Sequence, residues 1–84
     1  MSSGTDDIRT WLNERMAVYL QRTPEEIDTA LPLTEFGLDS LTALAVATDI
    51  EDEFSLELPP ELIWNNPSID ALSAVLGGLL QKKA

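Results

Sequence analysis

An all-α fold, a small four-helix bundle with a long first loop, is predicted by three features of this sequence. Apolar residues recur at helical spacing in three long segments, and no segment alternates convincingly with a period of two. A connection broken by Pro32 and Gly37 separates the first two segments. A chain of 84 residues buries about 60–65% of its unfolded surface, which is enough for one modest core. We therefore expect three longer helices, one short helix and a single domain.

The first helix is predicted from about Asp6 to Gln21. Thr5, Asp6 and Asp7 offer N-cap oxygens and negative charge at its start. Six apolar residues at helical spacing form one stripe: Ile8, Trp11, Leu12, Met16, Tyr19 and Leu20. We expect residues 1–5 to be flexible or left over from cloning, 6–81 to form the domain and 82–84 to form a tail.

A long connection from Arg22 to Leu38 follows. Thr23 and Pro24 are suited to begin a turn of helix, in which Glu26 would close a capping box. Such a long loop is unusual in a small domain unless it has a function. Four apolar residues are expected to hold it on the core: Leu31, Leu33, Phe36 and Leu38.

The second helix is predicted from Asp39–Ser40 to Glu53 or Phe54. Asp39 is a good N-cap, which places Ser40 in the first turn. One face is apolar and suited to the core: Ala43, Val46, Ala47, Ile50 and Phe54. On an adjacent face, a monomer needs no apolar residue. The residues there are Leu41, Leu44, Thr48 and Asp52.

The remaining helices are shorter or weaker. A short one is predicted from Pro59 or Pro60 to Trp64, stopped by the segment 65–67. The last begins after the cap Ser68, and glycines 77 and 78 weaken its final turns, where fraying is expected. Its apolar residues are Ile69, Leu72, Val75, Leu76, Leu79 and Leu80.

Composition excludes several classes of function. The chain has no cysteine and no histidine, which removes disulfides, Cys/His zinc sites and Ser–His–Asp catalysis. No apolar run approaches the ~20 residues needed to span a bilayer, and no signal peptide is evident, so a cytoplasmic protein is expected. With 15 acidic and 5 basic residues, the net charge of −10 argues against nucleic acid as a partner.

The charges are unevenly placed. All five basic residues lie towards the ends: Arg9, Arg15, Arg22, Lys82 and Lys83. Two interpretations stay open, a solvated acidic surface and a docking surface for a basic partner. An EF-hand-like alternation at Asp49, Glu51 and Glu53 has Phe54 where the required glycine would stand, so no metal site is expected.

The segment Gly37–Leu41 is the sharpest local feature. Gly37 permits a tight turn, Asp39 caps the helix, and Ser40 stands where free backbone N–H groups favour an anion. The simpler alternative is a capped helix start with an exposed serine. Ser40 is a poor nucleophile here, because no histidine exists and Asp39 is a weak base at neutral pH. We expect Ser40 to be acted upon, with no catalytic residue in the chain.

Residues 36–44 resemble the phosphopantetheine attachment motif of acyl carrier proteins, most closely those of polyketide synthases. The likeness continues through 49–54, 56–59 and 66–72, and it covers nearly the whole chain from residue 8 to residue 80. The resemblance implies that Ser40 receives 4′-phosphopantetheine from coenzyme A, with Gly37, Leu38, Asp39 and Leu41 completing the motif. The thiol of the arm would carry acyl or polyketide intermediates as thioesters.

The resemblance also implies partners and a contact surface. The partners would be a phosphopantetheinyl transferase and enzymes of the ketosynthase, acyltransferase or acyl-AMP ligase type. The chain itself is expected to be a monomer that binds neither nucleic acid nor membrane. The implied contact residues are Leu41, Leu44, Thr48, Glu51, Asp52 and Ile63. Ala45 departs from the family, because an acidic residue is common there.

Three other functions are weighed. An acidic helical adaptor would bind a basic protein without a cofactor, and its binding would be indifferent to Ser40→Ala. A peptidyl carrier fits less well, because Leu38 and Asp39 precede Ser40 where such carriers more often have a glycine-rich motif. A small hydrolase is poorly supported, because nothing in the sequence activates Ser40.

Overall fold

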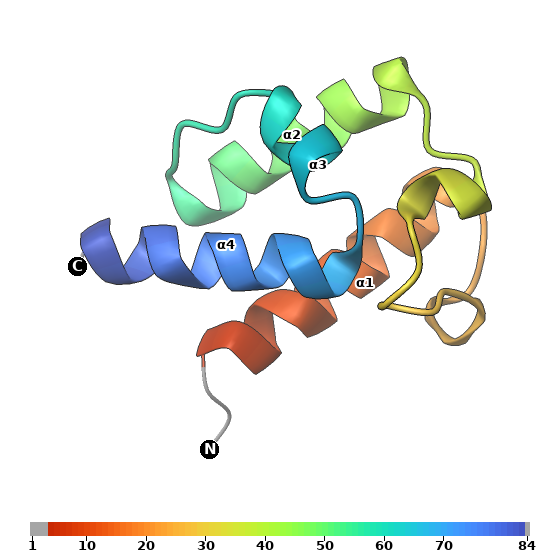
Figure 1. Cartoon of the computed structure of the whole chain (residues 1–84), viewed down its shortest axis with the longest axis horizontal. Helices are drawn as coiled ribbons and strands as arrows, with labels where there is room; N and C mark the ends of the chain where they lie inside the picture. Colours follow the sequence, from red (N-terminus) through yellow and green to blue (C-terminus); the bar gives the residue numbers. More distant parts are fainter. Residues whose placement is uncertain (1–3, 84) are drawn as a thin grey trace.

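The computed structural model describes residues 4–83 and confirms the all-α prediction. Its helical elements are α1 (Gly4–Leu20), η1 (Pro24–Glu26), η2 (Leu33–Phe36), α2 (Ser40–Phe54), α3 (Glu61–Asn65) and α4 (Ile69–Lys83) (Figure 1). The η elements are short 3₁₀ helices, and no strand occurs in the described residues. Across residues 4–83, no helix is both long and apolar enough to cross a membrane.

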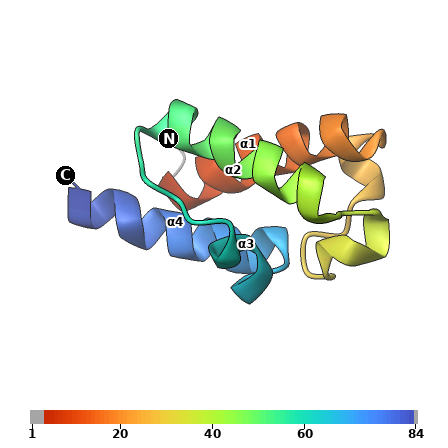
Figure 2. The same cartoon turned by 90° about the horizontal axis from the view of Figure 1, so that it is seen from above.

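The three long helices form the body of the bundle. α1 and α4 run in opposite directions, so the start of α1 and the end of α4 lie at the same end of the molecule (Figure 1). α2 lies along α1 with the opposite direction, and the short α3 leads directly into α4 (Figure 2). This arrangement encloses one core and leaves the outer face of α2 open to solvent.

Both ends of the helical region extend further than predicted. α1 begins at Gly4, so Thr5, Asp6 and Asp7 lie inside the helix instead of capping it. No residue there breaks a helix, and acidic residues suit a first turn. α4 continues through Gly77 and Gly78 to Lys83, because Leu79 and Leu80 pack against the core and offset the cost of the glycines. The expectations for residues 1–3 and 84 lie outside the described residues, and the domain limits stay a prediction.

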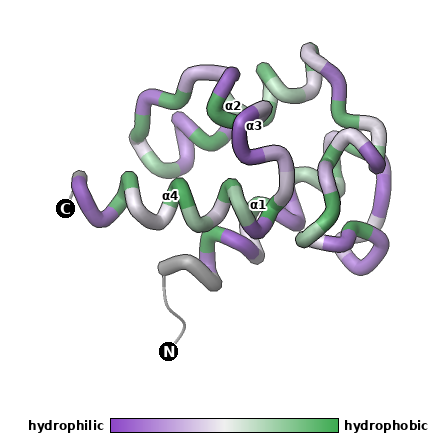
Figure 3. The backbone as a smooth tube through the Cα atoms, in the orientation of Figure 1, coloured by the Kyte–Doolittle hydropathy of each residue, from purple (hydrophilic) through white to green (hydrophobic). Residues whose placement is uncertain are grey.

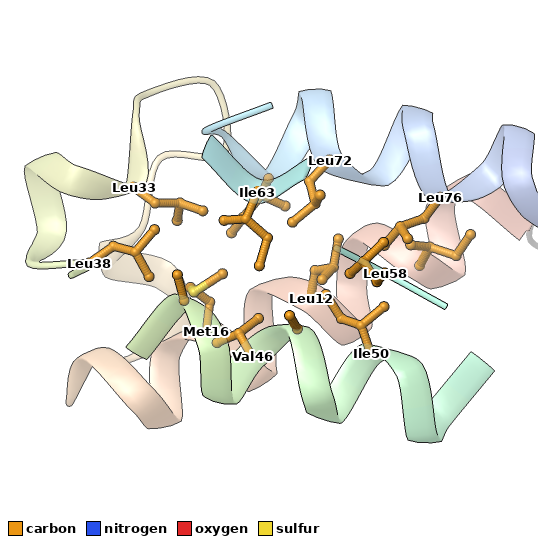
Figure 4. Packing of buried hydrophobic residues seen from close by; sticks show 14 of the residues in the cluster. Leu12, Met16, Leu33, Leu38, Val46, Ile50, Leu58, Ile63, Leu72 and Leu76 are labelled. Carbon is orange, nitrogen blue, oxygen red and sulfur yellow. The ribbon is translucent and has the colours of Figure 1, made fainter. Parts of the chain in front are cut away.

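The core draws on every helix and on the first loop. Figure 4 shows its centre, where labelled residues from the four α-helices, the first loop and the α2–α3 connection converge: Leu12, Met16, Leu33, Leu38, Val46, Ile50, Leu58, Ile63, Leu72 and Leu76. Green, hydrophobic positions recur along α4 at helical spacing, as Figure 3 shows. The predicted stripes on α1 and α2 are confirmed, with Trp11, Tyr19, Leu20 and Phe54 partly buried at the margin of the core.

The first loop is held on the bundle as predicted, with one exception. Leu33 and Leu38 are buried and Phe36 is half-buried against the core. Leu31 is 44% exposed, so its predicted core position is wrong. Its N–H instead donates to the carbonyl of Asp28 at 3.1 Å, in a turn that directs its side chain outwards.

Backbone hydrogen bonds join this loop to the start of α4. The Leu33 N–H donates to the Pro67 carbonyl at 2.7 Å, and the Asp70 N–H donates to the Thr29 carbonyl at 3.0 Å. The predicted capping interaction is present, because the Glu26 carboxylate accepts from the Thr23 N–H at 2.7 Å. That bond lowers the pKa of Glu26. The loop is therefore an ordered platform that leads into α2.

Candidate functional site

The turn before α2 is built by a glycine and anchored by a leucine. Gly37 has φ of 101°, a left-handed conformation that disfavours side chains, and its N–H donates to the Thr34 carbonyl at 3.2 Å. An added Cβ would meet nothing within 4 Å, so conformation and not space is the reason for glycine here. Leu38 then inserts into the core, which leaves the next two residues, Asp39 and Ser40, on the surface.

Asp39 caps α2, as predicted. Its Oδ1 accepts from the Thr42 N–H at 2.8 Å, and its carbonyl accepts from the Ala43 N–H at 2.8 Å. The Thr42 N–H bond favours the charged carboxylate and so holds the pKa of Asp39 below its ordinary value.

This cap corrects one expectation about the site. Ser40 was expected to stand among free backbone N–H groups, yet the Thr42 N–H already bonds to the Asp39 carboxylate, and the Ala43 N–H makes the first helical bond, to the Asp39 carbonyl. The carboxylate of Asp39 therefore occupies the position that an anion would take at this helix end. A phosphodiester on Ser40 would have to project away from these two groups.

Acid titration tests the role of Asp39. Because its pKa is lower in the folded chain, its charge stabilises the fold above the ordinary value of 3.8, and this contribution is lost as pH falls through the folded pKa. We expect Asp39→Ala to be less stable than wild type at neutral pH. This difference in stability should shrink as the pH falls below the ordinary pKa of 3.8. Asp39→Ser keeps a capping oxygen and should recover most of the neutral-pH loss. Urea unfolding at several pH values measures this, and a pH-independent difference between wild type and Asp39→Ala would contradict it.

Ser40 is exposed at the first position of α2. Among the side chains that the structure describes, none forms a hydrogen bond with its hydroxyl. An exposed hydroxyl on a rigidly capped helix fits covalent modification by another enzyme. It does not fit a nucleophile activated from within this chain.

The face of α2 that follows Ser40 is open. Leu41 is 78% exposed and Leu44 is 51% exposed, so neither of them packs in the core. Thr48 and Asp52 are also exposed on this helix. These four residues, Leu41, Leu44, Thr48 and Asp52, are called the α2 face below.

Two predicted contact residues do not belong to this face. Ile63 is completely buried, so the expectation that a partner contacts it directly is corrected. Glu51 is half-buried, and its Oε2 accepts from the Leu58 N–H at 2.8 Å. Glu51 therefore holds the connection between α2 and α3, a role that depends on a residue seven positions away and has no local sequence signal.

Asp49 also has a structural role that the sequence did not reveal. The Tyr19 hydroxyl donates to its Oδ2 at 2.6 Å, and Arg15 lies 3.8 Å from the same oxygen, which joins α1 to α2. The bond to Asp49 raises the pKa of Tyr19. Among the described residues, no group of three or more potential metal ligands forms.

The bundle thus presents a capped, exposed serine beside an open helix face, which is the arrangement of a small domain that carries a covalently attached group. The chain belongs to the phosphopantetheine-binding family, because the family model for the phosphopantetheine attachment site matches residues 10–76. The cofactor of the chain is accordingly covalent 4′-phosphopantetheine. The residues around Ser40 fit it, because the hydroxyl is exposed and unbonded.

Solved structures and curated sequences support this membership. The acyl carrier protein LipD from Actinoplanes friuliensis is 41% identical, with a TM-score of 0.78 over 98% of this chain and 97% of that one. A free-standing peptidyl carrier protein from Acinetobacter baumannii is 37% identical, with a TM-score of 0.88 over 90% of this chain and 95% of that one.

The curated relatives are much longer proteins. A phenolphthiocerol/phthiocerol polyketide synthase from Mycobacterium tuberculosis is 31% identical over 74 residues, which is 88% of this chain and 4% of that protein. Mellein synthase from Phaeosphaeria nodorum is 30% identical over 71 residues, again 4% of the relative. This chain is thus a carrier domain that resembles the acyl carriers of polyketide synthases, and it spans about 4% of the length of these relatives.

Proposed function

We propose that Ser40 bears the phosphopantetheine arm and that the chain carries acyl intermediates for polyketide assembly. The observation that supports this most strongly is the exposed, unbonded hydroxyl of Ser40 at the start of α2, inside the matched range 10–76. The turn at Gly37 and the cap of Asp39 hold that hydroxyl at the surface.

In this proposal the chain holds the Ser40 hydroxyl at its surface, and the modifying enzyme supplies the catalytic groups. When bound, the arm provides the thiol that forms thioesters, a group that this cysteine-free chain lacks. The Ser40 hydroxyl must lose its proton to a base on the modifying enzyme, because no side chain here is placed to take it. We therefore propose that the domain itself catalyses no reaction and acts in the cytoplasm.

The α2 face and the acidic charge are proposed as the docking surface. The leucines Leu41 and Leu44 offer apolar contact area, and the chain has no basic residue between Thr23 and Gln81. A phosphopantetheinyl transferase and a ketosynthase, acyltransferase or acyl-AMP ligase with a basic surface would complement it.

A peptidyl carrier is the second candidate, favoured by the 37% identity to the peptidyl carrier from Acinetobacter baumannii. The two candidates differ in cargo and share the arm. The intact mass of protein purified from its native host distinguishes them, because an aminoacyl increment supports the second candidate and an acyl or polyketide increment supports the first.

Intact-mass spectrometry also tests the attachment residue. After incubation with coenzyme A and a broad-specificity phosphopantetheinyl transferase, wild type should gain one phosphopantetheine and Ser40→Ala should gain none. Thr10→Ala removes another exposed hydroxyl, on α1, and should be modified like wild type. Absence of a gain in wild type, or a gain that persists in Ser40→Ala, rejects the proposal.

A further inference from the structure

Arg22 follows α1 at a firmly closed helix end. Gln21 has φ of 58°, the Gln21 N–H donates to the Val18 carbonyl at 3.3 Å, and the Arg22 N–H donates to the Ala17 carbonyl at 2.9 Å. This pair of bonds is a Schellman motif, which satisfies the last carbonyls of a helix. The backbone of Arg22 is therefore held by α1 and not by the loop that it begins.

The side chain of Arg22 reaches across the loop to one residue. Its Nε donates to the Phe36 carbonyl at 3.4 Å, and its Cζ lies 5.5 Å from the centre of the Phe36 ring. The two residues are 14 positions apart. A guanidinium over an aromatic face is an attractive contact, and the same group here also bonds the backbone of that residue.

Phe36 directly precedes the turn that leads to Ser40. It ends η2, and its carbonyl belongs to the peptide unit shared with Gly37, whose left-handed conformation redirects the chain. On its other side, the Phe36 ring packs against the core. Arg22 thus covers the ring from outside and ties its carbonyl to the end of α1.

The connection from α1 to α2 carries a single basic residue. The sequence has no lysine or arginine between Thr23 and Gln81, so Arg22 is the only cation on the connection from α1 to α2. Its substitution cannot be compensated by a neighbour on the same segment.

We infer that Arg22 is a positioning residue for the modification of Ser40, acting through Phe36 and the turn at Gly37. The inference rests on the proposed function, because it assigns Arg22 to the reaction at Ser40. Without the contact of Arg22 with Phe36, the turn samples more conformations in the complex that the carrier forms with the transferase. The Ser40 hydroxyl then lies in the productive position for a smaller fraction of the bound time, which lowers kcat and leaves docking unchanged.

Steady-state kinetics of the transferase on wild-type and variant carriers tests this. Arg22→Met keeps the apolar stem of the side chain out to about the position of Nε and removes the charged guanidinium with its donors, and we expect about a fivefold lower kcat with an unchanged KM for the carrier. Arg22→Lys still offers a donor and a cation, and it should recover at least half of the lost kcat. Arg9→Met removes another exposed arginine, which bonds Asp70 and joins α1 to α4, and should leave both constants unchanged.

Amide hydrogen exchange provides a second readout. The N–H groups of Gly37 and Leu38 bond the carbonyls of Thr34 and Leu33 at 3.2 and 3.3 Å, so they report on the turn. We expect both to exchange faster in Arg22→Met and to stay unchanged in Arg9→Met.

Three outcomes would overturn the inference. An unchanged kcat in Arg22→Met removes the positioning role. If Arg22→Met has a higher KM than wild type at low salt and this difference disappears at high salt, Arg22 contacts the transferase directly instead. A loss of kcat that vanishes on cooling, together with a lower Tm, means that Arg22 serves stability alone. Failure of the proposed function looks different, because then wild type itself gains no arm or Ser40→Ala gains one.

Discussion

Leu12→Ala is expected to lower the free energy of unfolding by about 2–5 kcal/mol, because the truncation leaves a cavity in the core. Leu12 is fully buried on α1 and lies among core residues of α2 and α4 (Figure 4). Domains of this kind have a total stability of about 5–15 kcal/mol, so the loss is a large part of it. Urea denaturation followed by circular dichroism measures the change.

Leu31→Ala is the matched control. It deletes the same atoms from a leucine that is 44% exposed, and we expect a change within about 0.5 kcal/mol. Similar losses for the two variants would mean that Leu31 is buried in solution and that the loop packs differently.

Leu41→Ala is expected to slow modification by the transferase about tenfold or more in kcat/KM. Leu41 adjoins Ser40 and is 78% exposed, so a partner that reaches Ser40 must cover it. Burial of a leucine in an interface contributes about 1.5–3 kcal/mol, and each 1.4 kcal/mol corresponds to about a factor of ten. Initial rates at several carrier concentrations, followed by intact mass, measure the effect.

Val18→Ala controls for the loss of an exposed apolar side chain. Val18 is 70% exposed on α1, outside the α2 face, and its substitution should leave kcat/KM unchanged. Equal effects of Leu41→Ala and Val18→Ala, or no effect of either, would contradict docking on the α2 face. Circular dichroism of both variants confirms that the fold is retained.

Much of the fold was predictable because its signals are local. The stripe on α1, the capping interaction at Thr23 and Glu26 and the cap of α2 by Asp39 each depend on residues within a few turns of one another. Ser68 was likewise predicted to cap α4 from its place in the sequence. The structure confirms this cap, since the Ser68 hydroxyl accepts from the Ala71 N–H at 3.1 Å. The candidate site shares this property, since its turn, cap and serine lie in one short segment.

The errors concern contacts between distant segments. Leu31 and Leu33 look alike in sequence, yet only Leu33 reaches the core, where its backbone N–H is bonded to the Pro67 carbonyl just ahead of α4. Ile63 was predicted at the surface and is buried, because α3 lies against the core and turns this side chain inwards (Figure 4).

The sequence by itself determined the helix class, the capped start of α2 and the placement of Ser40 in a segment without basic residues. Each follows from spacing, capping chemistry or composition along a continuous stretch of chain. Only the tertiary structure decided that Leu33 and not Leu31 enters the core, that Glu51 holds Leu58, and that Arg22 spans 14 residues to Phe36. These contacts depend on side-chain geometry and on how loops fold back, because a hydrogen bond forms only where donor and acceptor meet in space.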